Sequence, residues 1–294
     1  MSLPAFDATT GATFNYGGAP NTFSHTVGVG GTNRCLYVIY TGWADTNADY
    51  PGAATYGGVS MTKILDSNTG VGAVDRVIIF RLVNPATGAN NVSVTTSGAP
   101  GANALGAGRL QAISLTNVDQ TNPERNAGAT ANGNSTGPTV TVTSNANDMV
   151  LDGVASDGTG APSFTMVSDS GRTQLGNSNQ GNEIGASSRE ESPSASEVMD
   201  WTRGTAGVWS MAAISVQAPA TETGTYEQEG YRLRNDNGSE TTATWAAAQD
   251  TAGNLNLNTV GRLRILMNAT GDPAMENFRL EYRKQGGGNW RKVT

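Results

Sequence analysis

The clearest structural signal in this chain of 294 residues is the stretch Arg34-Cys-Leu-Tyr-Val-Ile-Tyr-Thr41. It is short, and it is rich in the β-branched and aromatic residues that favour extended backbone. A second stretch, Arg76-Val-Ile-Ile-Phe-Arg-Leu-Val83, has the same character. Because both are apolar on the two faces that a strand presents, we predict that they form central strands covered on both sides.

Four further runs have strand composition and are closed by turn residues. They are Asn91-Val-Ser-Val-Thr95, Pro138-Thr-Val-Thr-Val-Thr143, Met149-Val-Leu-Asp152 and Trp209-Ser-Met-Ala-Ala-Ile-Ser-Val216. Turn dipeptides such as Gly57-Gly58, Asn84-Pro85 and Asn237-Gly238 recur between the runs. This spacing predicts antiparallel hairpins and Greek-key connections, and therefore an all-β fold of the β-sandwich type. Only Thr241–Thr251 has helix-forming composition, and we expect at most a short helix or a turn there.

A change in composition divides the chain into two predicted domains. The segment Gln217-Ala-Pro-Ala-Thr-Glu-Thr-Gly224 follows the last strong strand and has linker character. We therefore predict a large domain over 1–218, a linker over 219–224 and a small domain over 225–294. The stretch Ser168–Ser196, which is rich in Ser, Asn and Gly, is predicted to form long loops or edge hairpins.

The chain is poor in the residues that most enzymes of this size use, since it contains one histidine, His25, and one cysteine, Cys35. It also has no nucleophile elbow, glycine-rich phosphate loop or zinc-ligand spacing. We therefore predict no catalytic residue and no cofactor, and we favour a role in binding or assembly. Cys35 is expected to be a buried core residue of a strand, and His25 an exposed or edge-strand residue.

Charge is distributed unevenly along the chain. Residues 1–223 carry 9 Lys/Arg against 17 Asp/Glu, a net charge of −8, and residues 224–294 carry 9 against 8, a net charge of +1. The acidic first part argues against nucleic acid as a partner. The N-terminus has no basic and apolar signal-peptide pattern, and no apolar run is long enough to span a membrane. Synthesis and folding in a cytosol are therefore expected.

Four blocks near the C-terminus stand in a recognisable order. They are Tyr231-Arg-Leu-Arg-Asn-Asp-Asn-Gly-Ser-Glu240, Ala243-Thr-Trp-Ala-Ala-Ala-Gln-Asp-Thr251, Leu263-Arg-Ile-Leu-Met-Asn-Ala-Thr-Gly-Asp-Pro273, and Leu280-Glu-Tyr-Arg-Lys284 with Trp290-Arg-Lys-Val293. Together they resemble a small β-sandwich module that recurs in structural proteins of tailed bacteriophages. The resemblance implies a small immunoglobulin- or fibronectin-like sandwich and a location on a virion.

The first part carries a second resemblance, through Ala54-Thr-Tyr-Gly-Gly-Val-Ser-Met-Thr62 and Phe80-Arg-Leu-Val-Asn-Pro-Ala-Thr-Gly88. It is similar to jelly-roll-like sandwich domains of phage and bacterial surface proteins. The two resemblances imply a structural protein on the exterior of a tailed-phage virion, foremost a capsid decoration or cement protein. Such a protein would be made in the host cytoplasm, form a homo-oligomer such as a trimer, and contact the major capsid protein or other virion proteins.

Two alternatives to capsid decoration remain open. One is a tail or head fibre that binds host surface glycans. Its candidate binding residues are Trp43, Tyr50 and Tyr56, whose rings lie near carboxylates and could form a sugar-binding platform. Packing of these rings within a hairpin is the competing interpretation.

The other alternative is a glycan hydrolase that uses two carboxylates. The residues that could supply such a pair are Asp148, Asp152, Asp157, Asp169, Glu183, Glu190, Glu191 and Glu197. An acidic surface would also explain carboxylates scattered in this way.

A weak calcium motif precedes the aromatic residues. Asp45, Asn47 and Asp49 have the alternating oxygen spacing with which a loop can wrap calcium. However, Tyr50 stands where an EF-hand loop needs glycine, and Tyr56 stands where it needs glutamate. The mismatch favours a solvated acidic turn without metal.

Arginines alternate along three predicted strands of the small domain. The pairs are Arg232 with Arg234, Arg262 with Arg264, and Arg279 with Arg283. Residues two apart on a strand face the same side, so these pairs could line one arginine-rich face. Such a face is either a solvated polar surface or a contact for an acidic partner, such as the first domain or a capsid surface.

Overall fold

The structure is a computed structural model that describes most of the chain. The described residues are 3–14, 21–44, 50–67, 75–96, 107–157, 163–167, 171–180, 183–191, 193–219, 225–239, 241–253, 260–270, 280–283, 289 and 291–292. The chain divides into two compact units, Met1–Pro219 and Ala220–Thr294. Strands and turns make up the described part, which contains no helix. The predicted all-β, antiparallel sandwich class is therefore confirmed, and Thr241–Thr251 forms turns.

The described residues of unit 1 form four antiparallel sheets. Sheet I has the order β2 (Asn21–Val27), β8 (Gly88–Thr96), β4 (Pro51–Tyr56) and β5 (Val59–Ser60). Sheet II has the order β1 (Ala5–Phe14), β9 (Gly108–Thr116), β3 (Cys35–Trp43), β7 (Asp75–Val83) and β6 (Thr62–Asp66). Sheet III has the order β10 (Ala129–Ser135), β17 (Gly207–Val216), β12 (Met149–Asp157), β15 (Glu183–Glu191) and β14 (Arg172–Gln180). Sheet IV has the order β11 (Thr139–Thr143), β16 (Ser196–Thr202) and β13 (Thr165–Met166).

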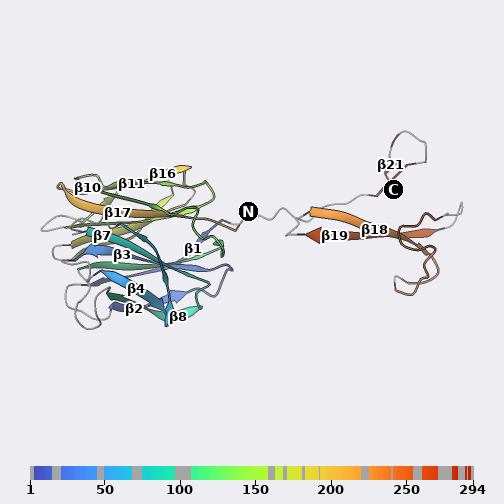
Figure 1. Cartoon of the computed structure of the whole chain (residues 1–294), viewed down its shortest axis with the longest axis horizontal. Helices are drawn as coiled ribbons and strands as arrows, with labels where there is room; N and C mark the ends of the chain where they lie inside the picture. Colours follow the sequence, from blue (N-terminus) through green and yellow to red (C-terminus); the bar gives the residue numbers. More distant parts are fainter. Residues whose placement is uncertain are drawn as a thin grey trace. The chain divides into compact units, whose positions relative to one another are not determined.

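The four sheets are stacked as layers, with a core between each neighbouring pair (Figure 1). Val38 and Phe80 of sheet II face sheet I, whereas Tyr37 and Ile39 of the same sheet face sheet III. Sheet III in turn packs its other side against Trp201 and its neighbours in sheet IV. The two inner sheets are thus buried on both faces, which is why β3 and β7 are apolar without alternation.

The predicted strands all occur in unit 1, with small differences at their ends. The run at Thr139–Thr143 alternates between exposed Thr and buried Val side chains, because one face of sheet IV is exposed to solvent. The polar stretch Ser168–Ser196 contains the hairpin of β14 and β15, with β14 at the edge of sheet III. Of its two predicted alternatives, the edge hairpin is therefore correct.

Unit 1 consists of two sandwiches with the same strand order. The first sandwich consists of sheets I and II, and the second consists of sheets IV and III. Taken in chain order, the strands β10 to β17 of the second sandwich occupy the same places as eight strands of the first, which are β1, β2, β3, β4, β6, β7, β8 and β9. The equivalent strands β9 and β17 also have similar sequences, Ala112-Ile-Ser-Leu115 in β9 and Ala213-Ile-Ser-Val216 in β17. Each motif pairs with the same part of its neighbour, since Cys35 lies opposite Leu115 and Met149 lies opposite Val216. The topology and the register together indicate an internal duplication.

The duplication assigns equivalent core positions to the two sandwiches. Val38 pairs with Ala112 and Phe80, and Asp152 pairs with Ala213 and Ser188, so Asp152 is the equivalent of Val38. Ser188 is by the same pairing the equivalent of Phe80. A position that is apolar and buried in the first sandwich is therefore occupied by a carboxylate in the second.

The described part of unit 2 is built on one long antiparallel pair, β18 (Thr225–Asn235) and β19 (Gly261–Thr270). A shorter pair is formed by β20 (Glu281–Tyr282) and β21 (Arg291–Lys292). Turns within residues 241–253 follow the edge of β18: Ala246 N–H donates to Leu233 O at 3.0 Å and Asp250 N–H donates to Tyr231 O at 2.9 Å. This edge contact brings Trp245 beside β18.

Candidate functional site: an arginine face on unit 2

The pairing of β18 with β19 places four arginines on one side of the sheet. Arg232 lies directly opposite Arg264, and Arg234 lies directly opposite Arg262. Directly opposite residues of an antiparallel pair point to the same face, and residues two apart on a strand also share a face. We call the surface formed by Arg232, Arg234, Arg262, Arg264 and Trp245 the arginine face.

One row of neighbouring residues runs across three segments of the chain and contains Trp245, Arg234 and Arg262. Trp245 forms a β-bridge with Arg234, whose other neighbour in the row is Arg262. The guanidinium carbons of Arg232, Arg234 and Arg264 lie 4.1, 4.6 and 5.9 Å from the centroid of the indole ring. At this range the negative face of the ring attracts each cation, with about 0.5–1 kcal/mol per contact at an exposed site.

Hydrogen bonds to the turn segment hold two of these side chains in place. Arg232 Nε donates to the carbonyl of Ala247 at 3.0 Å, and Arg234 donates to the carbonyl of Ala243. Arg234 is buried, whereas Arg264 is exposed. The guanidinium groups of Arg232 and Arg234 are therefore held by the turn segment, whereas the side chain of Arg264 is accessible to solvent.

One carboxylate of unit 2 already contacts this face. The distance between Asp236 Oδ1 and Arg262 Nη2 is 2.6 Å, and both side chains are about one-third exposed. Four cations on one small face repel one another, so negative groups are attracted to it. The planar guanidinium forks on this face have the geometry to bind oxyanions.

The structure brings together four of the six arginines that the sequence singled out. Arg279 lies outside the described residues, and Arg283 is exposed just after β20. Sequence reasoning missed Trp245, because its Ala-rich surroundings point to a helix or turn and contain no signal for pairing with β18. The turn at Asn237-Gly238 was the one local indication that the chain reverses here.

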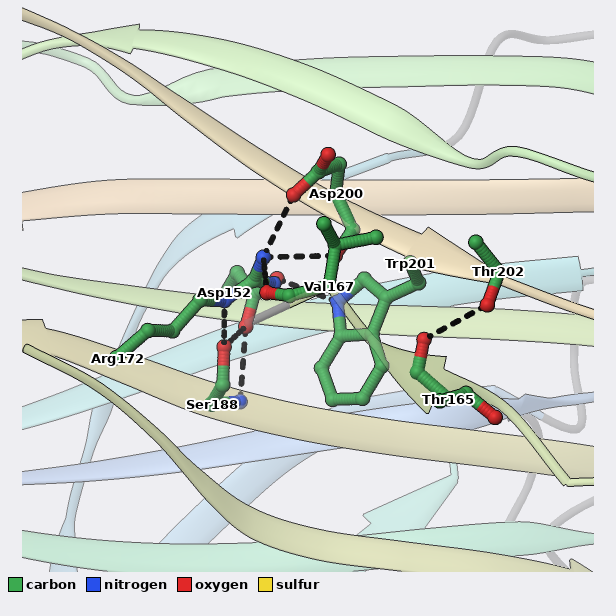
Figure 2. A network of polar contacts seen from close by, with 8 residues as sticks. All are labelled: Asp152, Thr165, Val167, Arg172, Ser188, Asp200, Trp201 and Thr202. Carbon is green, nitrogen blue, oxygen red and sulfur yellow. Dashed lines mark hydrogen bonds and ion pairs between the residues drawn. The ribbon is translucent and has the colours of Figure 1, made fainter. Parts of the chain in front are cut away.

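A second cluster of polar side chains lies between sheets III and IV of unit 1. Figure 2 shows Asp152, Arg172, Ser188 and Trp201 pointing toward one another from four different strands. Asp152 Oδ2 accepts hydrogen bonds from Trp201 Nε1 at 2.7 Å and from Arg172 Nη2 at 3.1 Å. Its Oδ1 accepts from the Ser188 backbone N–H at 2.8 Å and from the Ser188 hydroxyl at 2.6 Å.

The Asp152 cluster is enclosed by the protein. The side chains of Asp152 and Arg172 are 0% and 1% exposed, and Arg172 also donates to the carbonyl of Asp200 at 2.7 Å. Burial raises the pKa of Asp152, while the charge of Arg172 and the hydrogen bonds from Ser188 and Trp201 act in the opposite direction. Because each carboxylate oxygen has two donors and no solvent contact, we interpret this cluster as a structural element of the second sandwich.

The other carboxylates considered for a hydrolase are mostly engaged in similar ways. Asp148 Oδ1 is 2.6 Å from Arg125 Nη2, and its Oδ2 accepts from the Ser215 hydroxyl at 2.7 Å. Glu197 accepts from the Ser194 backbone N–H at 2.7 Å, and Glu191 is paired with Arg189. Glu190 is buried.

Three of the hydrolase candidates have no described side chain. Asp169 lies outside the described residues, and Asp157 and Glu183 are described for their backbone alone. Asp148, Asp152 and Glu197 are thus engaged in ion pairs or hydrogen bonds within unit 1.

Two of the three aromatic rings that were predicted to form a sugar-binding platform are not accessible to a sugar. Tyr50 and Tyr56 are 0% and 1% exposed and belong to the core between sheets I and II. Arg76 lies over the Tyr50 ring at 4.6 Å, and the Tyr56 hydroxyl donates to Gly88 O at 2.9 Å. Trp43 is half-buried. The two tyrosines therefore pack within the sandwich, and the calcium candidates Asp45, Asn47 and Asp49 lie outside the described residues.

Cys35 and His25 are both buried. Cys35 lies in β3, as predicted, and burial raises the pKa of its thiol to about 12, which makes it unreactive. Of the two predicted alternatives for His25, the edge strand is correct, because His25 lies on β2 at the edge of sheet I; its side chain is only 1% exposed. Its Nδ1 is 3.0 Å from the Thr10 hydroxyl, and its Nε2 has no hydrogen-bond partner.

The buried His25 predicts a loss of stability in mild acid. Burial lowers its pKa from the ordinary 6.5, with a smaller opposing effect of Asp7. The unfolded chain therefore binds the proton more tightly than the folded one, and stability present above about pH 6.5 is lost as the pH falls below it. We expect the melting temperature of unit 1 to fall between about pH 7.5 and about pH 5, and to fall less in a His25→Gln variant. Equal pH dependence in both proteins would contradict this role of His25.

The described residues include neither a metal-binding cluster nor a membrane-spanning helix. They contain no group of three or more His, Cys, Asp or Glu side chains arranged to hold a metal ion. Nor does that part of the chain include a helix with the length and apolar character needed to cross a membrane.

Comparison with known proteins gave no match: neither a family model, nor a curated protein, nor a solved structure is similar to this chain at a significant level. The arginine face and the stacked sandwiches are therefore interpreted from their own geometry.

Proposed function

We propose that this protein is a structural, non-enzymatic protein on the exterior of a tailed-phage virion, and that it acts as a capsid decoration protein. The observation that carries the contact role is the arginine face of unit 2, on which four arginines share one side of the sheet and three of their guanidinium groups lie over Trp245. The virion location is supported by the ordered sequence blocks at the C-terminus. Unit 1, with its three cores and structural ion pairs, serves as a rigid body that carries no reaction.

The decoration role works through many modest contacts. An arginine face binds carboxylates on a partner surface through paired hydrogen bonds, each of limited strength when exposed to solvent. Repetition of such contacts by a homo-oligomer over neighbouring capsid subunits makes the total attachment strong, because each further contact forms within an already tethered complex.

Removal of the protein from the particle tests this proposal. We expect heads that lack it to assemble but to open at a lower temperature or after milder osmotic shock, because ties between subunits stabilise the assembled state. The measurement is the fraction of intact heads after heating, with purified protein added back as the positive control. Protein with Arg262→Gln and Arg264→Gln should restore less stability than the unaltered protein.

The alternatives give different results in the same experiment. Particles that keep full head stability but fail to adsorb to cells would support a fibre that binds host glycans, and the decoration role would be rejected. Release of oligosaccharide from host glycans by the purified protein, lost on changing a single carboxylate, would support the hydrolase instead.

A further inference from the structure

The two inner sheets of unit 1 have four edge strands, which are β1 and β6 in sheet II and β10 and β14 in sheet III. The outer side of an edge strand presents backbone N–H and C=O groups that pair readily with another chain. Proteins prevent such pairing with charged residues or with β-bulges that distort the edge. Three of the four edges have both devices: β1 with a bulge between Phe6 and Ala8 and with Asp7, β6 with a bulge between Lys63 and Leu65 and with Lys63 and Asp66, and β14 with a bulge between Gln174 and Gly176 and with Arg172.

Edge strand β10 has neither device. Its sequence, Ala129-Thr-Ala-Asn-Gly-Asn-Ser135, contains no charged residue and no proline. All seven residues pair with β17 in an unbroken register. No other strand and no backbone hydrogen bond of the described residues occupies the outer side of β10. The second sandwich therefore has an open edge that is suited to the addition of a strand.

The internal duplication makes this difference informative, because β10 is the equivalent of β1. In β1 the carboxylate of Asp7 lies at the bulge, where its Oδ2 accepts hydrogen bonds from the Gly28 backbone N–H at 2.8 Å and from the Ser114 hydroxyl at 2.7 Å. The same edge is thus closed in the first sandwich and open in the second.

Contacts on the inner face hold β10 in its extended conformation. Trp209 lies directly opposite Gly133, and its Nε1 donates to the Ser135 hydroxyl at 3.0 Å. Ala129 and Ala131 pack against the core between sheets III and IV. An edge that is ordered in advance loses little entropy when a second strand joins it.

The opposite face of β10 is accessible to solvent. Its side chains Thr130, Asn132 and Asn134 are exposed, so no neighbouring sheet covers them. The adjoining edge strand of sheet IV, β11, is also free of charged residues. Together β10 and β11 form a neutral, polar side of the second sandwich.

The absence of charge favours a second copy of this chain as the occupant of the edge. A two-fold axis through an edge strand sets each residue near its counterpart, so a charged residue close to the axis would meet a like charge. With the axis at Asn132, the middle residue, all seven residues of β10 find a partner. Thr130 then lies opposite the partner's Asn134, and Ala131 lies opposite the partner's Gly133, which matches polar with polar and small with small residues.

We propose that unit 1 forms a two-fold symmetric dimer in which β10 pairs antiparallel with β10 of a second copy, so that sheet III continues through both chains. Main-chain hydrogen bonds supply the attraction, and the side-chain pairs across the axis set the register. This pairing names the interface of a homo-oligomer and goes beyond the decoration role. It does not rest on a virion location, because both surfaces belong to the purified chain.

Sedimentation of the purified full chain over a dilution series tests the dimer. We expect an equilibrium between monomer and dimer. In Asn132→Lys two ammonium groups meet at the axis, so the dissociation constant of the dimer should rise at least about tenfold. Asn91→Lys is the matched control, because it makes the same change at an exposed residue of β8, an inner strand of sheet I, and it should associate as the unaltered chain does.

A disulfide across the axis gives a positive signal for the same pairing. Directly opposite Cα atoms of an antiparallel pair are about 4.5–5.5 Å apart, which a disulfide can span. The native Cys35 is buried, and the pKa of its thiol is raised to about 12, so it does not compete. We expect Asn132→Cys to become a covalent dimer on mild oxidation, and the control Asn91→Cys to remain a single chain on a non-reducing gel.

Three results would overturn the proposal. They are a chain that stays monomeric at every concentration, equal association of Asn132→Lys and Asn91→Lys, and equal cross-linking of Asn132→Cys and Asn91→Cys. Circular dichroism of each variant establishes that it is folded, and the cross-linking comparison decides if Asn132→Lys does not fold. Failure of the dimer is distinguishable from failure of the decoration role, because the particle experiment measures head stability.

Discussion

Replacement of Arg172 by methionine is expected to lower the free energy of unfolding of unit 1 by about 3–5 kcal/mol. The reason is the environment of Asp152, which is 0% exposed and is paired with Arg172 Nη2 at 3.1 Å. Without the guanidinium, the carboxylate would have to remain charged in the core or take up a proton. Chemical denaturation with urea, followed by tryptophan fluorescence, measures the loss.

The first sandwich supplies a matched control for this change. The equivalent of Asp152 is Val38, and the equivalent of Arg172 is Met61. The second assignment follows from the register, because Thr62 pairs with Arg81 as Thr173 pairs with Arg189. Met61 and Arg172 are the residues that precede these two threonines. The double variant Asp152→Val with Arg172→Met therefore gives these two positions the residues of the first sandwich. We expect it to be clearly more stable than Arg172→Met alone, because no charge is left buried. If the double variant is the less stable of the two, the buried charge is not what makes Arg172 necessary.

Replacement of Gly153 by valine is expected to cost about 3 kcal/mol, at the upper end of the range for overpacking a core. A Cβ atom at Gly153 would lie 2.8 Å from Ile39 Cγ2, 2.9 Å from Val77 Cγ1 and 3.0 Å from Thr41 Cγ2. These atoms belong to β3 and β7 of sheet II, so the glycine permits the close approach of the two sandwiches. The melting temperature and the urea midpoint of unit 1 should both fall.

Gly30→Val is the control for the glycine experiment. Gly30 lies between β2 and β3, and a Cβ atom there would have no neighbour within 4 Å. Its change to valine should alter stability by no more than about 0.5 kcal/mol, as is usual for surface positions. Similar losses at both glycines would show that backbone flexibility, and not space between the sheets, accounts for the effect.

The arginine face shows how far sequence reasoning can reach. Alternation along a strand places Arg232 with Arg234, and Arg262 with Arg264, on a common side, because successive side chains of any strand point in opposite directions. Which strands pair, and in which register, is not a property of either strand alone. The structure was needed to place Arg234 opposite Arg262 and to bring Trp245 into the same row.

The internal duplication, in contrast, was not predicted from the sequence and is visible only in the structure. The two sandwiches share their strand order, but their cores have diverged: Val38 corresponds to Asp152, Phe80 to Ser188 and Ile39 to Gly153. A comparison of hydrophobic patterns does not bring out such a relation, because a buried position can be apolar in one copy and hydrogen-bonded in the other. The pairing registers make it visible.

Local patterns were sufficient for the fold class and for the strands, since β-branched runs and turn residues act through neighbouring atoms of the chain. They predicted β3 and β7 as central strands and Cys35 as a buried residue of a strand. Long-range packing settled what local patterns left open. It buried Tyr50, Tyr56 and His25, because a polar or aromatic residue is enclosed or exposed according to which sheet covers its strand, and that sheet is formed by residues far away in the chain.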